Sequence, residues 1–186
     1  MTTERAPTRE EPMLDDQPGT TPWALARERL SNPEPGQTSW LATVDRDGRP
    51  HLMPIIAFWI DGAFHFVVGE GTRKGRNLAA DGRCVIATGN TSPLPSLDFI
   101  VEGHAERLDD EAAVRPIAET LSGNNWPLEV RGDHVYGPHA PTAGPPPYSI
   151  YRMVPSKAFG LPGMFGMEQF DRADLPKPTR WEFDDA

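Results

Sequence analysis

The sequence predicts a mainly β protein whose antiparallel strands meander into a barrel. Short apolar runs follow one another between residues 40 and 108, and one short helical stretch interrupts them. Asp47-Gly48 and Asp61-Gly62 each separate two such runs, and Asp-Gly is a strong signal for a β-hairpin. Strands joined by tight turns pair antiparallel, and closing such a meander into a barrel removes its exposed edges.

Composition limits the classes of function. The chain has 186 residues, 38% of them hydrophobic, which suits one soluble domain with a real core. Its formal net charge of −9 argues against binding to nucleic acid or to an anionic membrane. No apolar run has the ~20 residues of a membrane span, no signal peptide is apparent, and Cys84 is the single cysteine. We expect a cytoplasmic protein.

The N-terminal residues 1–20 are rich in Pro, Thr, Asp and Glu, so we expect a flexible tail followed by one domain over residues 21–186. A short helix should begin the domain, with Thr21 as its N-cap and Pro22 as its first residue. Trp23, Ala26 and Leu30 then share the face that packs on the core.

The rest of the domain up to residue 108 consists of one helix and five strands in the prediction. After the helix at about residues 72–80, Asp81-Gly82 is a plausible stop, with Gly82 free to adopt a positive φ. Apolar character and turn residues predict strands at residues 40–44, 51–60, 64–68, 84–88 and 97–108.

A third helix is expected over residues 109–121, where Pro116 weakens or kinks it. Residues 137–147 form a stiff Pro-rich loop, which in a protein of this size is a lid, a partner surface or simply mobile. Two more strand-like stretches cover residues 148–154 and 157–161.

The clearest functional signal is the stretch from Gly69 to Leu78, which follows a strand and opens a helix. Arg73, Lys74 and Arg76 lie in the first turns of that helix, where the macrodipole disfavours cations unless an anion binds. Free backbone N–H groups and cations at a helix start form a site for phosphate. A solvated basic turn without a ligand is the alternative.

Within this stretch Lys74 is the first candidate for a phosphate contact, followed by Arg73 and Arg76. Helical spacing places residues 73 and 76 on one face and residues 74 and 77 on another, so the four side chains should not all converge. Asn77 either contacts ligand or bonds locally, and Thr72 is a candidate N-cap. His134 and His139 lie in a Pro/Gly-rich region without cysteine partners, so we expect no metal site.

Residues 41–50, 74–78 and 81–86 together resemble the pyridoxamine 5′-phosphate oxidase-like split β-barrel superfamily, which has an FMN-binding-like fold. Residues 159–164 are similar to the C-terminal segment of its flavin/deazaflavin oxidoreductase branch. The resemblance implies a homodimer that holds FMN or coenzyme F420 between its subunits. It also implies that the basic cluster grips the cofactor phosphate and that strand-two backbone, including Pro54, lies along the ring system. Trp181 either covers that ring or docks the C-terminal segment on the barrel.

The chain lacks the Leu-Lys pair and the Arg-Leu-His-type ending of pyridoxamine 5′-phosphate oxidase itself, which disfavours oxidation of vitamin B6. Lys74, Arg76 and Asn77 are more similar to the deazaflavin group, which favours F420 over FMN. The sequence shows no obvious acid–base pair, so the cofactor would carry the hydride chemistry. We therefore expect an F420- or FMN-dependent oxidoreductase acting on a small organic molecule. The alternative is a non-catalytic protein that binds or stores a flavin, haem or fatty ligand in the same barrel.

Overall fold

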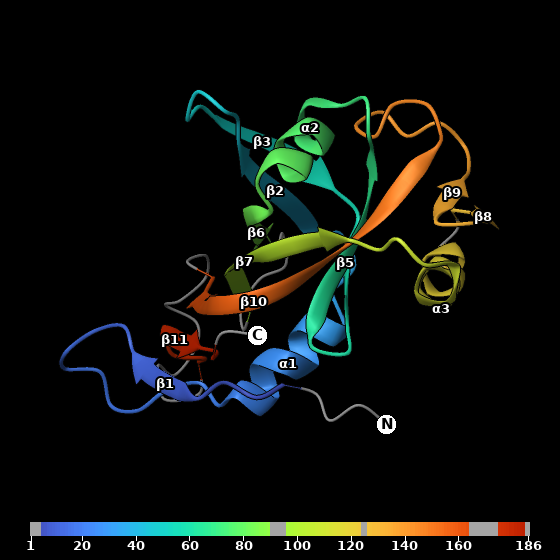
Figure 1. The fold of residues 1–186 in the computed structure, drawn as a ribbon. Helices are drawn as coiled ribbons and strands as arrows, with labels where there is room; N and C mark the ends of the chain where they lie inside the picture. Colours follow the sequence, from blue (N-terminus) through green and yellow to red (C-terminus); the bar gives the residue numbers. More distant parts are fainter. Residues whose placement is uncertain (1–4, 90–95, 124–125, 164–174, 185–186) are drawn as a thin grey trace.

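A curved antiparallel β-sheet forms the body of the protein (Figure 1). The computed structural model describes residues 5–89, 96–123, 126–163 and 175–184. The described strands are β1 (Arg9–Pro12), β2 (Thr38–Val44), β3 (Pro50–Ile55), β4 (Ala57–Ile60), β5 (Ala63–Gly69), β6 (Arg83–Gly89), β7 (Leu97–Arg107), β8 (Glu129–Arg131), β9 (His134–Tyr136), β10 (Tyr148–Pro162) and β11 (Thr179–Glu182). The described helices are α1 (Trp23–Ser31), α2 (Arg73–Ala80) and α3 (Glu111–Ser122). The predicted mainly β, antiparallel class is confirmed.

Strand β10 connects the parts of the sheet. It pairs with β7 along most of its length, while its other edge pairs first with β5 and then with β11. The register shifts between Pro155 and Lys157, and a bulge of this kind bends a strand. The two strands predicted at residues 148–154 and 157–161 are therefore one bent strand.

Two hairpins carry the predicted Asp-Gly turns. In the β4–β5 turn, Asp61 and Gly62 both have positive φ (49° and 77°), as a two-residue hairpin loop requires. In the β2–β3 turn, Asp45 Oδ1 accepts hydrogen bonds from the backbone N–H of Asp47 (3.0 Å) and of Arg49 (2.9 Å). The strand predicted over residues 51–60 breaks at residue 56, because β3 pairs with β2 whereas β4 pairs with β5.

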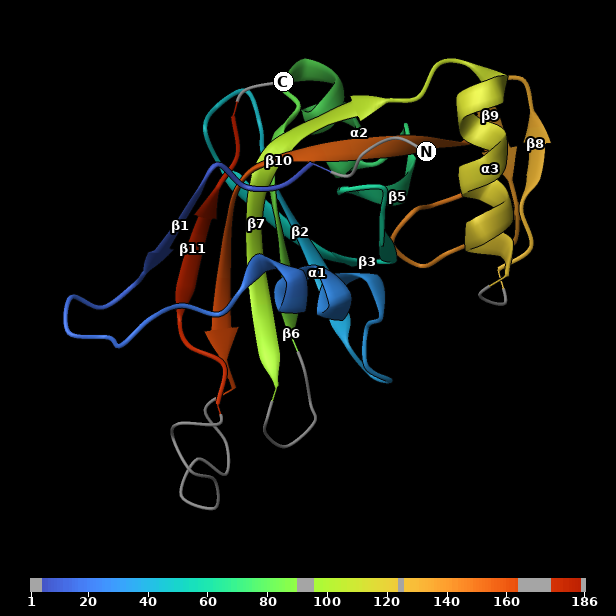
Figure 2. The same ribbon diagram turned by 90° about the horizontal axis from the view of Figure 1, so that it is seen from below.

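The core has two parts. The larger cluster lies inside the curved sheet and includes the fully buried Leu41, Ile86 and Met153. The smaller cluster packs α3, β8 and β9 against the first half of β10, at one end of the molecule (Figure 2). The helix predicted at residues 109–121 is confirmed as α3, with Pro116 inside it.

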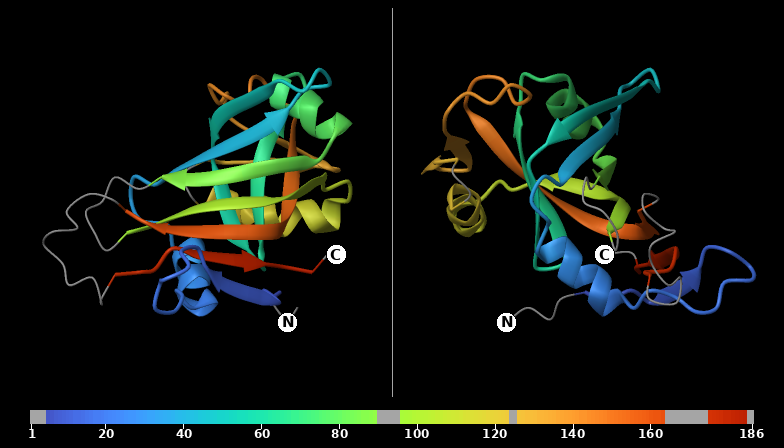
Figure 3. Two further views of the ribbon diagram at one scale, coloured as in Figure 1. Left: turned by 90° about the vertical axis from the view of Figure 1, so that its left-hand side faces the viewer. Right: turned by 180° about the vertical axis from the view of Figure 1, so that it is seen from behind.

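The N-terminal segment differs from the predicted flexible tail. Strand β1 pairs with β11 and extends the sheet, at the side of the molecule where α1 also lies (Figure 3). Glu10 Oε2 accepts hydrogen bonds from the Trp181 indole N–H (3.1 Å) and from the Trp23 backbone N–H (3.2 Å). These bonds supply tertiary contacts that a composition argument does not see. Residues 1–4 of the predicted tail lie outside the described part of the chain.

Helix α1 starts differently from the prediction. Pro22 is the N-cap residue, and Thr21 ties the helix to the C-terminal segment instead. The Thr21 backbone N–H donates to Thr179 Oγ1 (2.8 Å), and the Thr21 hydroxyl donates to the Lys177 carbonyl (2.8 Å). The predicted buried face of Trp23, Ala26 and Leu30 is confirmed.

Candidate functional site

Helix α2 begins at a tight corner that directly follows β5. Thr72 is its N-cap, as predicted: the hydroxyl accepts a hydrogen bond from the Gly75 backbone N–H (3.2 Å) and donates to the Gly69 carbonyl (2.6 Å). A Cβ at Gly75 would lie 2.6 Å from the Gly69 carbonyl oxygen, so only glycine fits there. The Thr72 hydroxyl therefore forms its hydrogen bonds within the corner itself.

The two faces of α2 separate Lys74 from Arg73 and Arg76, as their spacing indicated, whereas Asn77 lies on the same cavity wall as the arginines. Arg73 and Arg76 line an open cavity of about 530 Å³ together with the β2–β3 turn. Arg73 faces Asp45 across this cavity, with 3.6 Å between the guanidinium and a carboxylate oxygen. The guanidinium of Arg76 donates to the Gly71 carbonyl (2.6 Å). Each arginine presents five N–H donors, so both keep free donors for an anion.

Lys74 points away from that cavity. Its side chain is only 2% exposed, and its ammonium donates to the backbone carbonyl of Thr142, in the Pro-rich loop. Burial lowers the pKa of Lys74 from its usual range. Lys74 was the first candidate for a phosphate contact; in this arrangement its ammonium is covered, because its helix face turns inward against the loop.

Asn77 has the structural role that the sequence left open. Its side-chain amide donates to the Thr43 hydroxyl of β2 (3.0 Å), and both residues are buried. Asn77 also lies on the wall of the 530 Å³ cavity. The bond fixes α2 against β2 and so holds the arginine face of the helix toward the β2–β3 turn.

The end of α2 corrects a prediction about Gly82. Its φ is not positive; the glycine instead allows a close approach, since a Cβ there would lie 2.5 Å from the Ala105 carbonyl oxygen. The Gly82 carbonyl also accepts a hydrogen bond from the Ala105 backbone N–H (2.8 Å). The helix stops at Asp81, which is extended.

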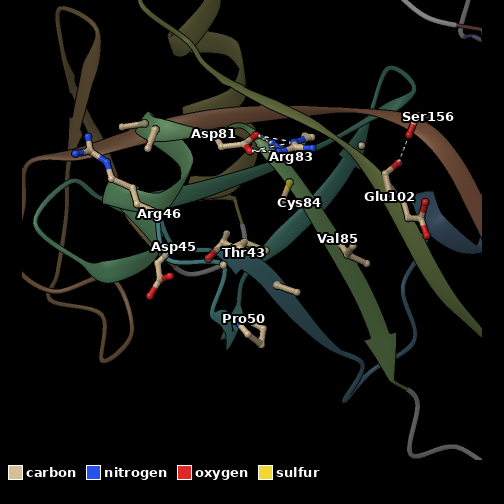
Figure 4. Close-up of a pocket in the computed structure, with 16 residues that line it drawn as sticks. Thr43, Asp45, Arg46, Pro50, Asp81, Arg83, Cys84, Val85, Glu102 and Ser156 are labelled. Carbon is tan, nitrogen blue, oxygen red and sulfur yellow. Dashed lines mark hydrogen bonds and ion pairs between the residues drawn. The ribbon is translucent and has the colours of Figure 1, made fainter.

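A larger groove of about 1050 Å³ adjoins the arginine cavity (Figure 4). Asp45 and Arg46 lie at one side of it and Glu102 with Ser156 at the other, with Val85 between them. The walls of both cavities share Asp45, Arg46, Ala79 and Ala80, so a ligand can extend from one into the other.

Two titratable groups of the groove are held away from proton transfer near neutral pH. Hydrogen bonds from Arg83 lower the pKa of Asp81 to about 2. Burial raises the pKa of the Cys84 thiol to about 12, so it stays protonated and unreactive. The groove can therefore bind a ligand through its shape and its charged side chains, whereas Asp81 and Cys84 do not act as an acid or a base there.

Pro54 and Trp181 are placed apart from each other. Pro54 of β3 pairs directly with Trp40 of β2, which pairs in turn with Ala87 of β6 and so reaches Ile100 of β7. Residues paired in this way share a face of the sheet, here the outer face next to the groove. Trp181 is fully buried and packs edge-on against Trp23, with ring centroids 5.4 Å apart. It docks the C-terminal segment, which was one of its two predicted roles, and covers no cavity described here.

Sequence reasoning missed this exposed apolar face. Trp40 is 39% exposed and Leu52 is 56% exposed, although both lie in strands. The signal was available, because β2 and β3 carry apolar residues at both alternating positions, where a strand facing water would carry polar ones. It also missed the groove, whose charged residues Arg46 and Glu102 lie far apart in the sequence.

A polar cluster behind the helix corner was missed as well. The Glu70 carboxylate accepts a hydrogen bond from the Ser149 hydroxyl (2.7 Å) and lies 3.2 Å from His134 Nε2 and 3.5 Å from Arg107 Nε. The bond from Ser149, followed by that from His134, lowers the pKa of Glu70. The cluster joins the start of α2 to β7, β9 and β10.

Neither a metal centre nor a membrane span is indicated by the described residues. No three His, Cys, Asp or Glu side chains among them are grouped to hold a metal ion. In the same part of the chain, none of the helices has the length and apolar character needed to cross a bilayer.

Comparison with known proteins shows which solved structures share this fold and which family model matches the chain. Solved structures that align with the chain include a haem-binding protein from Mycobacterium smegmatis (21% identity, 79% of this chain and 57% of that chain, TM-score 0.53). They also include HupZ from Group A Streptococcus (18% identity, 73% and 94%, TM-score 0.52) and a putative pyridoxamine 5′-phosphate oxidase from Listeria innocua (18% identity, 75% and 95%, TM-score 0.51). At these identities the likeness concerns the fold. Curated protein sequences give no significant match. The model of the family described as pyridoxamine 5′-phosphate oxidase matches residues 28–158, more than half of the chain, and the protein belongs to that family.

Proposed function

We propose that this protein binds a phosphorylated flavin-type cofactor, F420 in preference to FMN, and acts as an oxidoreductase on a small organic molecule. The observation that carries the proposal is the pair of guanidinium groups of Arg73 and Arg76 on the wall of an open cavity that runs along the side of α2. The helix dipole favours an anion only at the end of this cavity nearest Arg73. Membership of the pyridoxamine 5′-phosphate oxidase family supports a phosphorylated ligand.

The residues of the site suit such a ligand in charge and shape. Arg73 is held to Asp45 only by a long ion pair whose arginine side chain is half exposed, and a phosphate can displace it at little cost. Beyond the arginines, Ala42, Val44 and Val85 give the adjoining groove an apolar floor on which a planar ring can lie. When bound, the cofactor supplies the hydride chemistry. The chain binds the phosphate, orients the ring and excludes water from it.

A homodimer is part of the proposal. The row formed by Pro54, Trp40, Ala87 and Ile100 leaves a broad apolar face open beside the groove. Exposed apolar patches of this kind mark interaction surfaces. A second copy of this chain seated on the row would cover it and roof the groove, which completes the cofactor site.

The arginine pair is tested by a double variant, Arg73→Ala with Arg76→Ala. Each charge-assisted hydrogen bond contributes about 1.5–3 kcal/mol, so affinity for F420 and FMN should fall by at least about tenfold. Quenching of tryptophan fluorescence reports binding, and the chain has five tryptophans. Arg115→Ala is the matched control, because Arg115 is an exposed arginine in an ion pair on α3.

Unchanged affinity in the double variant would refute the site. Turnover of reduced cofactor with a panel of unsaturated acceptors separates the two functions that the sequence allows. Binding without turnover by any acceptor identifies the non-catalytic storage function. Binding of haem in place of both phosphorylated cofactors would contradict the proposal.

A further inference from the structure

The Pro-rich segment 137–147, here called the strap, is seated on the corner where α2 begins. The carbonyl of Thr142 accepts the hydrogen bond of the Lys74 ammonium. The neighbouring Ala143 carbonyl presses on Gly69 so closely that a Cβ there would lie 1.9 Å from its oxygen. Gly144 follows with φ of 75°, and Thr72 lies beside it. The strap thus covers the start of α2 on the face that points away from the arginine cavity.

Lys74 is poorly compensated in this position. Its side chain is 2% exposed, and among the described residues no carboxylate lies within ion-pair distance of its ammonium. A buried ammonium strongly favours an anionic partner, and a neutral carbonyl is a weak substitute. The ammonium also lies in the first turn of a helix, where the dipole opposes it.

The strap is held at a few points. Ala143 is buried, but Pro141 and the three prolines 145–147 are exposed. The Tyr148 hydroxyl lies within hydrogen-bond distance of the Gly144 carbonyl (2.8 Å) and the Pro138 carbonyl (3.2 Å), and the Trp126 indole N–H also donates to the Pro138 carbonyl (3.2 Å). A segment held at a few points, with its prolines in solvent, opens locally without unfolding of the sheet.

We infer that the strap is a gate over Lys74: an anionic group reaches the ammonium only when the strap leaves, and it then takes the place of the Thr142 carbonyl. The open gate exposes the Lys74 ammonium on the face of α2 that points away from the arginine cavity. The claim that the strap covers Lys74 rests only on the geometry described above. Its coupling to an anion rests on the proposed function.

Amine labelling tests the gate without any cofactor. The chain has three lysines, Lys74, Lys157 and Lys177, so acetylation can be followed at each by mass spectrometry. Lys74 should react at least about tenfold more slowly than Lys157, whose side chain is 35% exposed. Tyr148→Phe should speed labelling of Lys74 about 2- to 12-fold, the value of one lost hydrogen bond, and leave Lys157 unchanged.

Tyr136→Phe on β9 is the matched control and should change nothing. Gly144→Ala is a second loosening variant, because alanine is strained at φ of 75°. Labelling of Lys74 at the rate of Lys157 in the wild type would overturn the gate. So would labelling that neither loosening variant accelerates.

The coupling is tested by amide hydrogen exchange with FMN or F420 as the probe. The Ala143 and Gly144 amides donate to the Ala140 carbonyl (both 3.1 Å) and should exchange faster in the cofactor-saturated protein. Lys74→Met, which keeps the aliphatic stem without the charge, should abolish that increase. Unchanged exchange at saturation would overturn the coupling. If neither cofactor binds, the proposed function fails, and the labelling result alone decides the gate.

Discussion

At the scale of single residues, burial decides what the polar side chains of this barrel can do. Lys74 and Asn77 are candidates by residue type, yet each is buried, and the side chain of Lys74 donates to a carbonyl and that of Asn77 to a hydroxyl. Arg73 and Arg76 keep exposed donors. The residue types therefore indicated that α2 carries the site, and burial shows which face of the helix can bind a ligand.

The Asn77–Thr43 bond is expected to support the site through stability. Asn77→Ala leaves the buried Thr43 hydroxyl without its donor, which should lower the free energy of unfolding by about 1–3 kcal/mol. Urea unfolding measures the change. Thr43→Val in the same background should recover part of the loss, because no unpaired hydroxyl then remains. A strictly additive double variant would contradict the bond.

His65 should make the protein sensitive to acid. Burial, with help from Arg152, lowers the pKa of His65 from 6.5 to about 4. The folded state therefore binds this proton less well than the unfolded state. The stability that neutral His65 contributes above pH 6.5 is lost as the pH falls from 6.5 to about 4, a loss of about 3 kcal/mol. Thermal unfolding of His65→Phe should show a smaller fall over this window; an equal fall would assign the acid sensitivity to other groups.

At the scale of elements, Gly75 in the first turn of α2 and Gly82 just after its end allow the close backbone contacts that set where the helix lies. Gly82→Ala forces a Cβ to within 2.5 Å of the Ala105 carbonyl oxygen, so it should lower the free energy of unfolding by at least about 1 kcal/mol. Gly71→Ala is the matched control, because nothing lies within 4 Å of its Cβ. Urea unfolding compares the two, and equal stabilities would show that the backbone around Gly82 adjusts freely.

The elements were predicted well where local patterns determine them. The Asp-Gly hairpins, helix α2 with its Thr72 cap and helix α3 all follow from turn and capping chemistry over a few residues. The breaks that depend on partners were not predicted. Whether residue 56 interrupts a strand, or the bulge after Pro155 joins two, depends on strands distant in the sequence. Strand β1 was not predicted for the same reason, because it depends on pairing with the distant β11.

The candidate site was predicted in part. The sequence places the cations on α2 and separates them into two faces, but it does not show which face the strap covers. It leaves open whether Trp181 covers a cofactor ring or docks the C-terminal segment, since the contact with Trp23 joins residues far apart in the chain. Long-range burial, which no local pattern records, accounts for both.

At the scale of the whole molecule, the outer sheet face is expected to hold two copies together. Trp40→Glu places a charge in the middle of the apolar row and should convert a dimer into a monomer at micromolar concentration. Light scattering after size exclusion measures the mass. Met13→Glu, an exposed apolar residue outside the row, is the control. A wild-type monomer, or a Trp40→Glu dimer, would contradict the proposed interface.

The central claim is that the protein recognises a cofactor through its phosphate. The most direct measurement is a fluorescence titration of the cofactor-free wild-type protein with F420, FMN and riboflavin, because riboflavin is FMN without the phosphate. We expect F420 and FMN to bind, with F420 the tighter, and riboflavin to bind at least about tenfold more weakly than FMN. Equal affinity for FMN and riboflavin, or binding of none of the three, would contradict it.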